Sequence, residues 1–120
     1  MERVAVLGAS KKEDRYSYKA VDLLKKHGHK VFPINPVEKE ILDLPVYGSL
    51  ADLPERPDTL SLYVNPKLIE KVVDDIIELN PKRVIFNPGT ESDSAMEKIK
   101  AAGITVVQGC TLIMLNTNQF

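Results

Sequence analysis

Short apolar runs alternate along the chain with longer segments in which apolar residues recur at helical spacing. The first run, residues 3–7, is almost continuously apolar, as expected for a strand buried on both faces. Five such runs predict five strands, at residues 3–7, 30–34, 59–64, 83–86 and 104–107. Strands that alternate with helical segments are typical of βαβ units and a mainly parallel sheet.

Local signals mark the ends of three helices between these strands. The first is predicted over residues 17–27, with Ser17 as N-cap and Gly28 as its stop. The second begins at Asn65–Pro66, where Asn65 is the cap and proline takes the first helical position, and it ends at Asn80–Pro81. The third covers residues 92–102 and stops at Gly103.

The apolar stripe of the second helix is predicted to be core rather than a ligand surface. Its members are Leu68, Ile69, Val72, Val73, Ile76 and Ile77. Residues 37–58 contain three prolines and are predicted to form a loop with a short helix near residues 49–53. The tail, residues 110–120, either forms a short helix or lies against the sheet, and both alternatives stay open.

These elements predict an α/β fold, a Rossmann-like doubly wound five-stranded parallel sheet in a single three-layer domain spanning residues 1–120. Right-handed crossovers are the rule for such connections. We expect the strand order 3-2-1-4-5, in which strand 1 lies beside strand 4.

Charge and composition limit the classes of partner. The chain has 16 basic and 17 acidic residues and a net charge of -1, which argues against nucleic-acid or anionic-membrane binding. No apolar run approaches the roughly 20 residues of a membrane helix, and the N-terminus leads directly into a strand without a signal-peptide pattern. With a single cysteine, Cys110, no internal disulfide is possible. We therefore expect a cytoplasmic protein without nucleic-acid or membrane partners.

Ligands of doubly wound sheets bind at the carboxyl ends of the strands, where the strand order reverses. The predicted order places that reversal between strands 1 and 4. Four turns rich in Gly, Pro, Asn and Ser reach this edge. They comprise Gly8, Ala9 and Ser10; Asn35 and Pro36; Val64, Asn65 and Pro66; and Asn87, Pro88, Gly89 and Thr90.

The first of these turns carries the features of a phosphate site. Gly8 permits a tight turn and close approach of a ligand, and the helix start near Ser17 offers unpaired N–H groups. Arg15 is the side chain best suited to grip a phosphate, with Lys11, Lys12 and Lys19 beside it. The competing interpretation is a common glycine turn with solvated lysines. For the two tyrosines beside this turn, one interpretation is that Tyr16 or Tyr18 stacks on a base or donates a hydrogen bond to a phosphate. The alternative is that Tyr18 only packs against the start of the helix.

Several nucleotide-binding motifs are missing. Only the first glycine of G-x-G-x-x-G is present, at Gly8, and no acid ends the second strand to bind a ribose. A Walker A motif and the aspartate cluster of a receiver domain are also absent. These absences count against an NAD-binding enzyme.

A combination of short segments resembles the small stand-alone CoA-binding proteins, which share their domain with the N-terminal part of the succinyl-CoA synthetase α subunit. The segments are residues 8–10, 15–21, 28–31, 33–36, 46–50, 63–66, 86–90 and Cys110, so the similarity spans nearly the whole chain. It implies a Rossmann-like fold with CoA lying across the carboxyl edge of the sheet.

By position, the resemblance implies a role for each turn. Residues 8–10 with Arg15 and Ser17 meet the phosphates, and Asn35–Pro36 flanks the nucleotide. The turn at 64–66 lies along the adenine or the pantetheine, and the turn at 87–90 closes the other side.

The chain also departs from the family. Many members have Trp-x-Gln-x-Gly where this chain has residues 86–89 as Phe-Asn-Pro-Gly, and Asp-Arg-Cys where it has Gln108–Cys110. The larger synthetases carry a phosphorylated histidine in a separate domain that this chain does not contain. His27 and His29 are therefore expected to be surface residues, and Cys110 a packing residue or, alternatively, a thiol that forms a mixed disulfide with CoA.

The leading interpretation is a non-catalytic CoA- or acyl-CoA-binding protein that acts as a carrier, a sensor or an accessory module. Two alternatives stay open. One is an NAD- or flavin-dependent enzyme on the same fold, and the other is a protein-interaction module with a vestigial nucleotide site.

Overall fold

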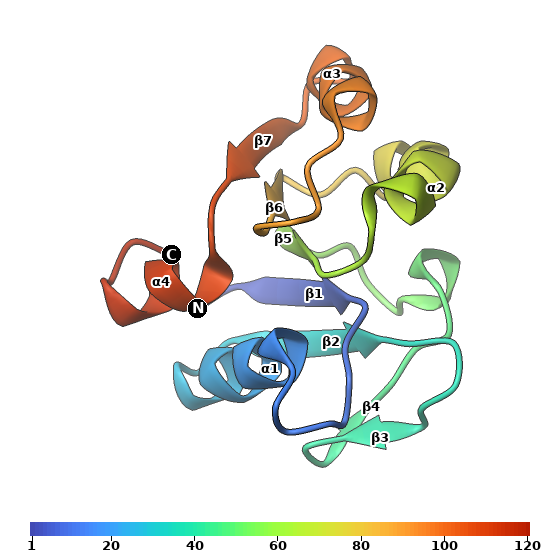
Figure 1. Ribbon diagram of the computed structural model, residues 1–120. Helices are drawn as coiled ribbons and strands as arrows, with labels where there is room; N and C mark the ends of the chain where they lie inside the picture. The colour runs from blue at the N-terminus through green and yellow to red at the C-terminus, as the bar shows by residue number, and fades with distance from the viewer.

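Five parallel strands form the central sheet, as the apolar runs predict. A computed structural model describes residues 1–120 (Figure 1). The strands are β1 (Arg3–Leu7), β2 (Lys30–Ile34), β5 (Thr59–Leu62), β6 (Arg83–Phe86) and β7 (Thr105–Gln108). The last strand begins one residue later than expected, and the third ends two residues earlier.

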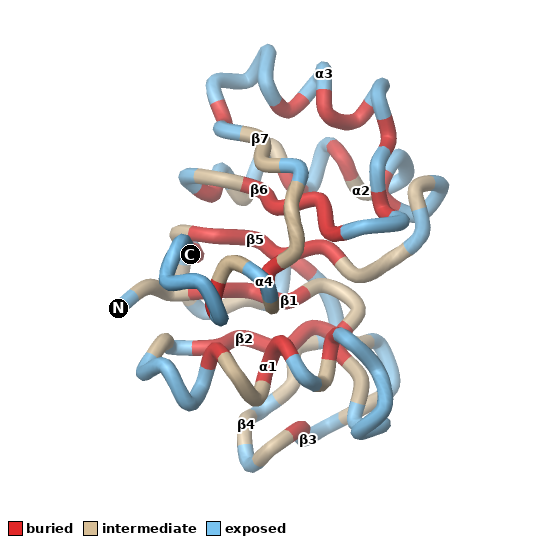
Figure 2. Tube along the Cα trace, turned by 60° about the vertical axis from the view of Figure 1, so that its left-hand side comes forward, coloured by how far each residue is buried: buried red, intermediate tan, exposed pale blue.

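Helices cover both faces of the sheet, which confirms the three-layer α/β fold. They are α1 (Tyr16–Lys26), α2 (Pro66–Leu79), α3 (Asp93–Ala101) and α4 (Thr111–Asn116). The helices α2 and α3 pack together on one face, and α1 and α4 on the other (Figure 1). Alternate residues of β1 enter the two cores, Ala5 on the α2 side and Val4 and Val6 on the α1 side. The strands between the layers are mostly buried (Figure 2).

The strand order is β2-β1-β5-β6-β7, or 2-1-3-4-5 for the five parallel strands, so the predicted order 3-2-1-4-5 is wrong. After β2 the chain crosses back over β1 instead of adding a strand outside β2. The start of β5 docks beside β1, where the N–H of Arg3 donates to Asp58 Oδ2 at 2.8 Å. The reversal point therefore lies between β1 and β5.

Pro33 gives the physical reason why β2 lies at the edge of the sheet. Proline has no N–H to donate to a strand ladder and is confined to edge strands or strand ends. The predicted order would have placed β2, with Pro33 in its interior, between two other strands. In the observed order β2 pairs with β1 alone among the strands of this sheet.

Residues 35–58 wrap around that edge from one face to the other. A short hairpin, which the sequence pattern does not predict, forms from β3 (Glu40–Ile41) and β4 (Leu44–Pro45). Ile41 packs into the core on the α1 side. A 3-10 turn, η1 (Leu50–Asp52), follows within the predicted 49–53 segment, and Leu50 packs into the core on the α2 side.

Most helix ends agree with their local signals. Asn65 caps α2 by accepting a hydrogen bond from the N–H of Leu68 at 2.9 Å, and Asn80 ends the helix in the left-handed conformation. Ser92 caps α3 by accepting from the N–H of Ala95 at 3.3 Å. The tail forms α4, which decides between the two alternatives for residues 110–120.

The start of α1 differs from the prediction. The N-cap position is Arg15, and Ser17 is buried within the first turn. The N–H of Arg15 donates to the carbonyl of Lys12 at 3.0 Å, so the preceding loop already turns the backbone toward the helix before Ser17. None of the four helices has the length and apolarity that crossing a lipid bilayer requires.

Candidate functional site

Gly8 lies at the end of β1, where the order of the strands reverses. Its backbone has φ of 89°, a conformation that favours glycine. A Cβ atom at this position would lie 2.6 Å from the carbonyl oxygen of Tyr63 and 2.7 Å from a methyl group of Val64. Glycine is therefore required because the ends of β1 and β5 lie against each other.

A polar hollow of about 210 Å³ opens on the α1 side of Gly8, and we call it the polar depression. Its other lining residues are Ser10, Arg15, Tyr16, Ser17 and Tyr63. Four of the residues predicted to meet the phosphates thus come together here, namely Gly8, Ser10, Arg15 and Ser17. Ala9, the fifth residue of that prediction, is fully buried and does not line the depression.

The polar depression presents unpaired hydrogen-bond donors. The N–H groups of Tyr16, Ser17 and Tyr18 in the first turn of α1 donate no hydrogen bond within the protein. Arg15 is exposed and belongs to none of the ion pairs, whereas Lys11 pairs with Glu38 at 3.6 Å. A helix N-terminus with a free guanidinium at its cap is suited to an anion.

The two tyrosines of the first turn of α1 have different surroundings. Tyr16 lines the polar depression and is 70% exposed, with Lys19 Nζ 5.6 Å from its ring centroid. Tyr18 packs against the core on the α1 side. Of the two alternatives for Tyr18, packing is therefore the one its contacts favour.

A second hollow of about 210 Å³ opens on the α2 side of Gly8, and we call it the apolar slot. The ends of β1 and β2 form its floor at Leu7 and Ile34. Residues 48–50 and Pro36 form one wall, and α2 with the turn before it forms the other. The two hollows share Gly8, so a ligand that crosses the carboxyl edge of the sheet at this residue contacts both.

The apolar stripe of α2 divides between the core and the apolar slot. Ile69, Val73 and Ile76 are buried in the core, as predicted. Val72 packs against this core and also lines the slot, whereas Leu68 lines the slot and is 40% exposed. The prediction that the whole stripe is core is therefore wrong for Leu68, which lies on the side of the helix that faces residues 48–50.

The turn after β2 holds the loop after β1 in place. The amide nitrogen of Asn35 donates to the carbonyl of Ala9 at 2.8 Å, and its Oδ1 accepts from the N–H groups of Val37 and Glu38 at 2.8 and 3.0 Å. Asn35 thus uses its side chain within the protein, whereas Pro36 lines the slot.

The turn after β5 contributes to the slot and to its rim. Val64 lines the slot. Asn65 and Pro66 start α2 and border a shallow hollow that also includes Lys67, Leu68 and Lys71. Both lysines are exposed beside the mouth of the slot, with which this hollow shares Leu68.

The turn after β6 lines neither hollow. Asn87 is buried, and its amide nitrogen donates to Ser61 Oγ at 2.9 Å and to the carbonyl of Leu62 at 2.8 Å. Thr90 donates to the carbonyl of Asn87 at 2.7 Å, while Pro88 and Gly89 are exposed. These residues lie apart from Gly8 because β5 stands between β1 and β6.

Tyr63 is a lining residue that the sequence pattern does not single out. Its hydroxyl is buried and has no hydrogen-bond partner, and this burial raises the pKa of the phenol to about 12. Its sequence signals are its place before the turn at Val64 and its membership of segment 63–66, which carries part of the family resemblance. Cys110 is half-buried at the start of α4 and lines neither hollow.

Both histidines precede β2, so they lie at the amino ends of the strands, whereas Gly8 lies at the carboxyl ends. His27 is exposed, as predicted. His29 is half-buried, and its Nδ1 accepts a hydrogen bond from the N–H of Glu2 at 3.0 Å. No group of three histidine, cysteine or acidic side chains is arranged to hold a metal ion.

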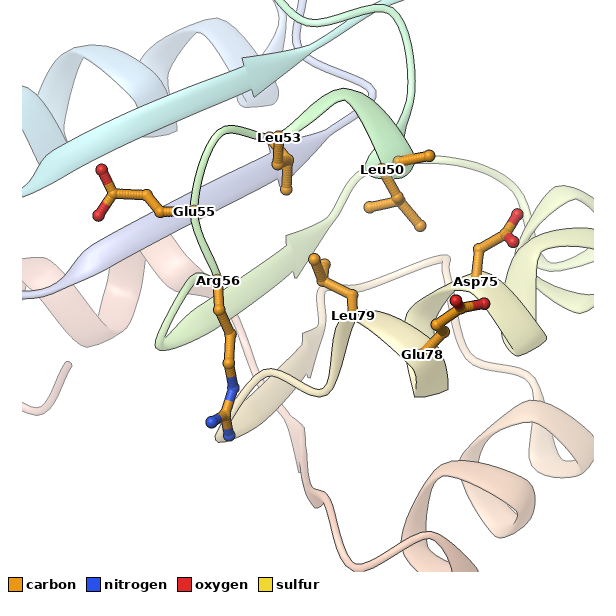
Figure 3. Close-up of a pocket in the computed structure, with 8 residues that line it drawn as sticks. Leu50, Leu53, Glu55, Arg56, Asp75, Glu78 and Leu79 are labelled. Carbon is orange, nitrogen blue, oxygen red and sulfur yellow. The ribbon is translucent and has the colours of Figure 1, made fainter.

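A further hollow of about 390 Å³, which we call the outer groove, lies between η1 and α2 (Figure 3). The side chains of Leu50, Leu53 and Leu79 converge on it, and Asp75 and Glu78 stand on the α2 side (Figure 3). It shares Leu50 and Asp75 with the apolar slot, so the slot opens into it at that end.

The doubly wound sheet and the paired hollows at its reversal point define the class as a Rossmann-like α/β domain. Residues 2–116 match the family described as the CoA binding domain. The chain belongs to this CoA binding domain family, as the resemblance in its turns implied.

Relatives include both small and large proteins. The chain is 24% identical over 106 residues to the uncharacterized protein YneT of Bacillus subtilis, covering 88% of this chain and 78% of YneT. It is 29% identical over 126 residues to an ADP-forming acetate–CoA ligase II of Archaeoglobus fulgidus. That match covers 95% of this chain and only 19% of the ligase, so the chain spans about a fifth of that relative.

Solved structures share the fold. A crystal structure of an uncharacterized protein has a TM-score of 0.94 and 39% identity, covering 100% of this chain and 98% of the other. A protein from Thermus thermophilus has a TM-score of 0.92 and 28% identity, with coverage of 99% and 90%. The dinucleotide-forming acetyl-coenzyme A synthetase 1 of Ca. Korarchaeum cryptofilum, in complex with phosphate and ADP, has a TM-score of 0.76 and 25% identity, covering 89% of this chain and 25% of the synthetase.

Proposed function

We propose that this protein binds CoA or an acyl-CoA as a non-catalytic carrier, sensor or accessory module. The observation that carries the proposal is the junction at Gly8, where a polar depression with free donors meets an apolar slot. The two hollows suit the two chemically different parts of an ADP group. Membership of the CoA binding domain family supports CoA as the ligand that supplies this group.

The diphosphate is assigned to the polar depression. Three unpaired N–H groups and the positive end of the dipole of α1 lie in the first turn of this helix, of which Tyr16 and Ser17 line the depression. Arg15 adds a guanidinium that has no acid partner to release before it binds a phosphate. Its position at the N-cap of α1 brings charge and N–H groups to one place.

The nucleoside is assigned to the apolar slot. Aliphatic side chains from β1, β2, α2 and residues 48–50 surround a narrow space that suits a flat aromatic base. The crossing at Gly8 lets the ribose pass close to the backbone, because no side chain projects there.

The ionisable side chains of the two hollows suit binding rather than proton transfer. They are Arg15, Tyr16, Tyr63 and Asp75. A pKa of about 12 keeps Tyr63 protonated at neutral pH. Tyr63 is thus unsuited to act as a general base, which requires a pKa near the working pH, and this supports the non-catalytic role.

Isothermal titration calorimetry with CoA, acetyl-CoA, NAD and ATP tests the proposal. We expect CoA and acetyl-CoA to bind more tightly than the other two ligands. Arg15→Ala should weaken CoA binding roughly ten- to a hundredfold, since a charge-assisted hydrogen bond to phosphate is worth about 1.5–3 kcal/mol. Lys98→Ala, which removes an exposed cation on α3, is the matched control and should bind as the wild type does. No heat with any ligand would contradict the proposal and favour a protein-interaction module with a vestigial site.

A further inference from the structure

The three hollows around the sheet edge form a connected series. The polar depression meets the apolar slot at Gly8, and the slot meets the outer groove at Leu50 and Asp75. A ligand whose diphosphate occupies the depression and whose nucleoside enters the slot points its base away from Gly8. The far end of the base then approaches Leu50 and Asp75.

Asp75 is the only ionisable side chain that lines the apolar slot. Val72 follows Leu68 by four residues and Asp75 follows Val72 by three, so the three side chains lie along one side of α2. Asp75 stands about 10 Å along the helix from Leu68, given a rise of about 1.5 Å per residue. An acid thus stands at the end of a passage otherwise lined by aliphatic residues, glycine, proline and one serine.

The carboxylate of Asp75 is available to a ligand. The seven ion pairs of the protein all involve other acids. The nearby Ser49 is already engaged, because its hydroxyl donates to Asp52 Oδ2 at 3.0 Å. Among the side chains of the slot, Asp75 is therefore the strong acceptor without a donor.

A carboxylate beside an anion-binding site opposes the binding of a polyanion, so a specific hydrogen bond is needed to offset this repulsion. An ionised carboxylate only accepts hydrogen bonds. The adenine base presents an N6 amino group as a donor on its edge. We infer that Asp75 recognises the base of the bound nucleotide by accepting a hydrogen bond from the N6 amino group of adenine. This inference rests on the proposed function, because it requires the nucleoside to occupy the slot.

The experiment compares CoA with 1,N6-etheno-CoA, in which N6 has no N–H to donate, by calorimetry. Wild-type protein should bind CoA about tenfold more tightly than etheno-CoA, the range expected for loss of one charge-assisted hydrogen bond at a partly exposed site. Asp75→Ala should bring the preference close to one. Asp75→Asn should keep most of it, because the amide oxygen still accepts.

Glu78→Ala is the matched control. Glu78 is exposed on the same helix and lines the outer groove but not the slot. This variant removes the same charge and should keep the tenfold preference, so any gain in affinity that it shares with Asp75→Ala reports general repulsion. The Tm of each variant, which should match that of the wild type, shows that the fold is retained.

Two results would overturn the inference alone. One is an Asp75→Ala protein that keeps the preference for CoA, because the preference would then come from the bulk of the etheno ring and not from a hydrogen bond to Asp75. The other is a Glu78→Ala protein that loses the preference equally. In both cases CoA still binds and still depends on Arg15. Failure of the wild type to bind either ligand would instead overturn the proposed function and this inference together.

Discussion

The side chain of Asn87 accepts a hydrogen bond at 2.9 Å from the backbone N–H of Thr111, and so joins the end of β6 to the start of α4. The same side chain donates to Ser61 Oγ and to the carbonyl of Leu62. Ser61 and Thr111 in turn lie 2.8 Å apart, oxygen to oxygen. One amide therefore connects two strands and the last helix within the buried interior.

Replacing Asn87 should lower stability without removing the ligand site. Asn87→Ala leaves several buried polar groups unpaired, and each costs about 1–3 kcal/mol. We expect the free energy of unfolding to fall by about 2–4 kcal/mol in urea denaturation, again from these unpaired groups. CoA affinity measured well below the Tm should stay unchanged. Asn116→Ala, at an exposed position on α4, is the control and should behave as the wild type does.

Gly8 and Gly89 form a matched pair of glycines with φ of 89° and 90°. Gly8→Ala carries both the cost of an unfavourable φ and a clash with Tyr63, whereas a Cβ at Gly89 meets nothing within 4 Å. We expect Gly89→Ala to cost about 1 kcal/mol and Gly8→Ala several times more. Thermal unfolding and calorimetry with CoA measure both effects, and only Gly8→Ala should lose binding. Equal losses of stability in the two variants would contradict the close approach of β1 and β5.

Tyr63→Phe should stabilise the protein slightly or leave its stability unchanged. The hydroxyl of Tyr63 is buried without a hydrogen-bond partner, so its removal loses no bond and ends a desolvation cost of about 1–3 kcal/mol. Differential scanning calorimetry measures the change in Tm. A clear decrease in Tm would show that the hydroxyl makes a stabilising contact with the nearby Ser61 or Thr111.

His29 should make stability dependent on pH below neutrality. Burial is the largest cause that lowers the pKa of His29, and Nδ1 must be unprotonated to accept from the N–H of Glu2. The unfolded chain therefore takes up a proton at higher pH than the folded protein. Stability is fully present above the unfolded pKa of about 6.5 and decreases as the pH falls from that value toward the lower folded pKa.

His29→Gln and His27→Gln separate this effect from the general response to acid. His27 is exposed, so its replacement should leave the slope of stability against pH between 7 and 5 close to that of the wild type. His29→Gln should flatten that slope. Urea midpoints measured at intervals of half a pH unit provide the comparison, and identical slopes in the two variants would contradict the assignment.

Half of the candidate site follows from local sequence signals. Gly8, Ser10, Arg15 and Ser17 come together at the polar depression, because a strand end, a glycine and a helix start lie within ten residues of one another. Leu68, Val72 and Asp75 of the apolar slot could not be assigned in this way. Their role depends on how residues 48–50 pack opposite α2, and that packing is a contact between distant segments.

The turn at residues 87–90 shows how strand order controls the site. Its composition resembles that of the other turns, but β5 separates β6 from β1 and moves this turn away from Gly8. Pro33 was the available signal, since an internal proline favours an edge strand and argues against the order 3-2-1-4-5.

The amino-acid sequence alone determined the strands, three of the helices and most of their ends, because apolar periodicity and capping act over a few neighbouring residues. Only the tertiary structure decided the strand order, the hairpin of residues 40–45 and the composition of the apolar slot. These features depend on which buried surfaces fit together after the chain crosses β1. Apart from the edge position of β2, which Pro33 favours, the choice is made by packing between segments far apart in the sequence, and local patterns do not record that packing.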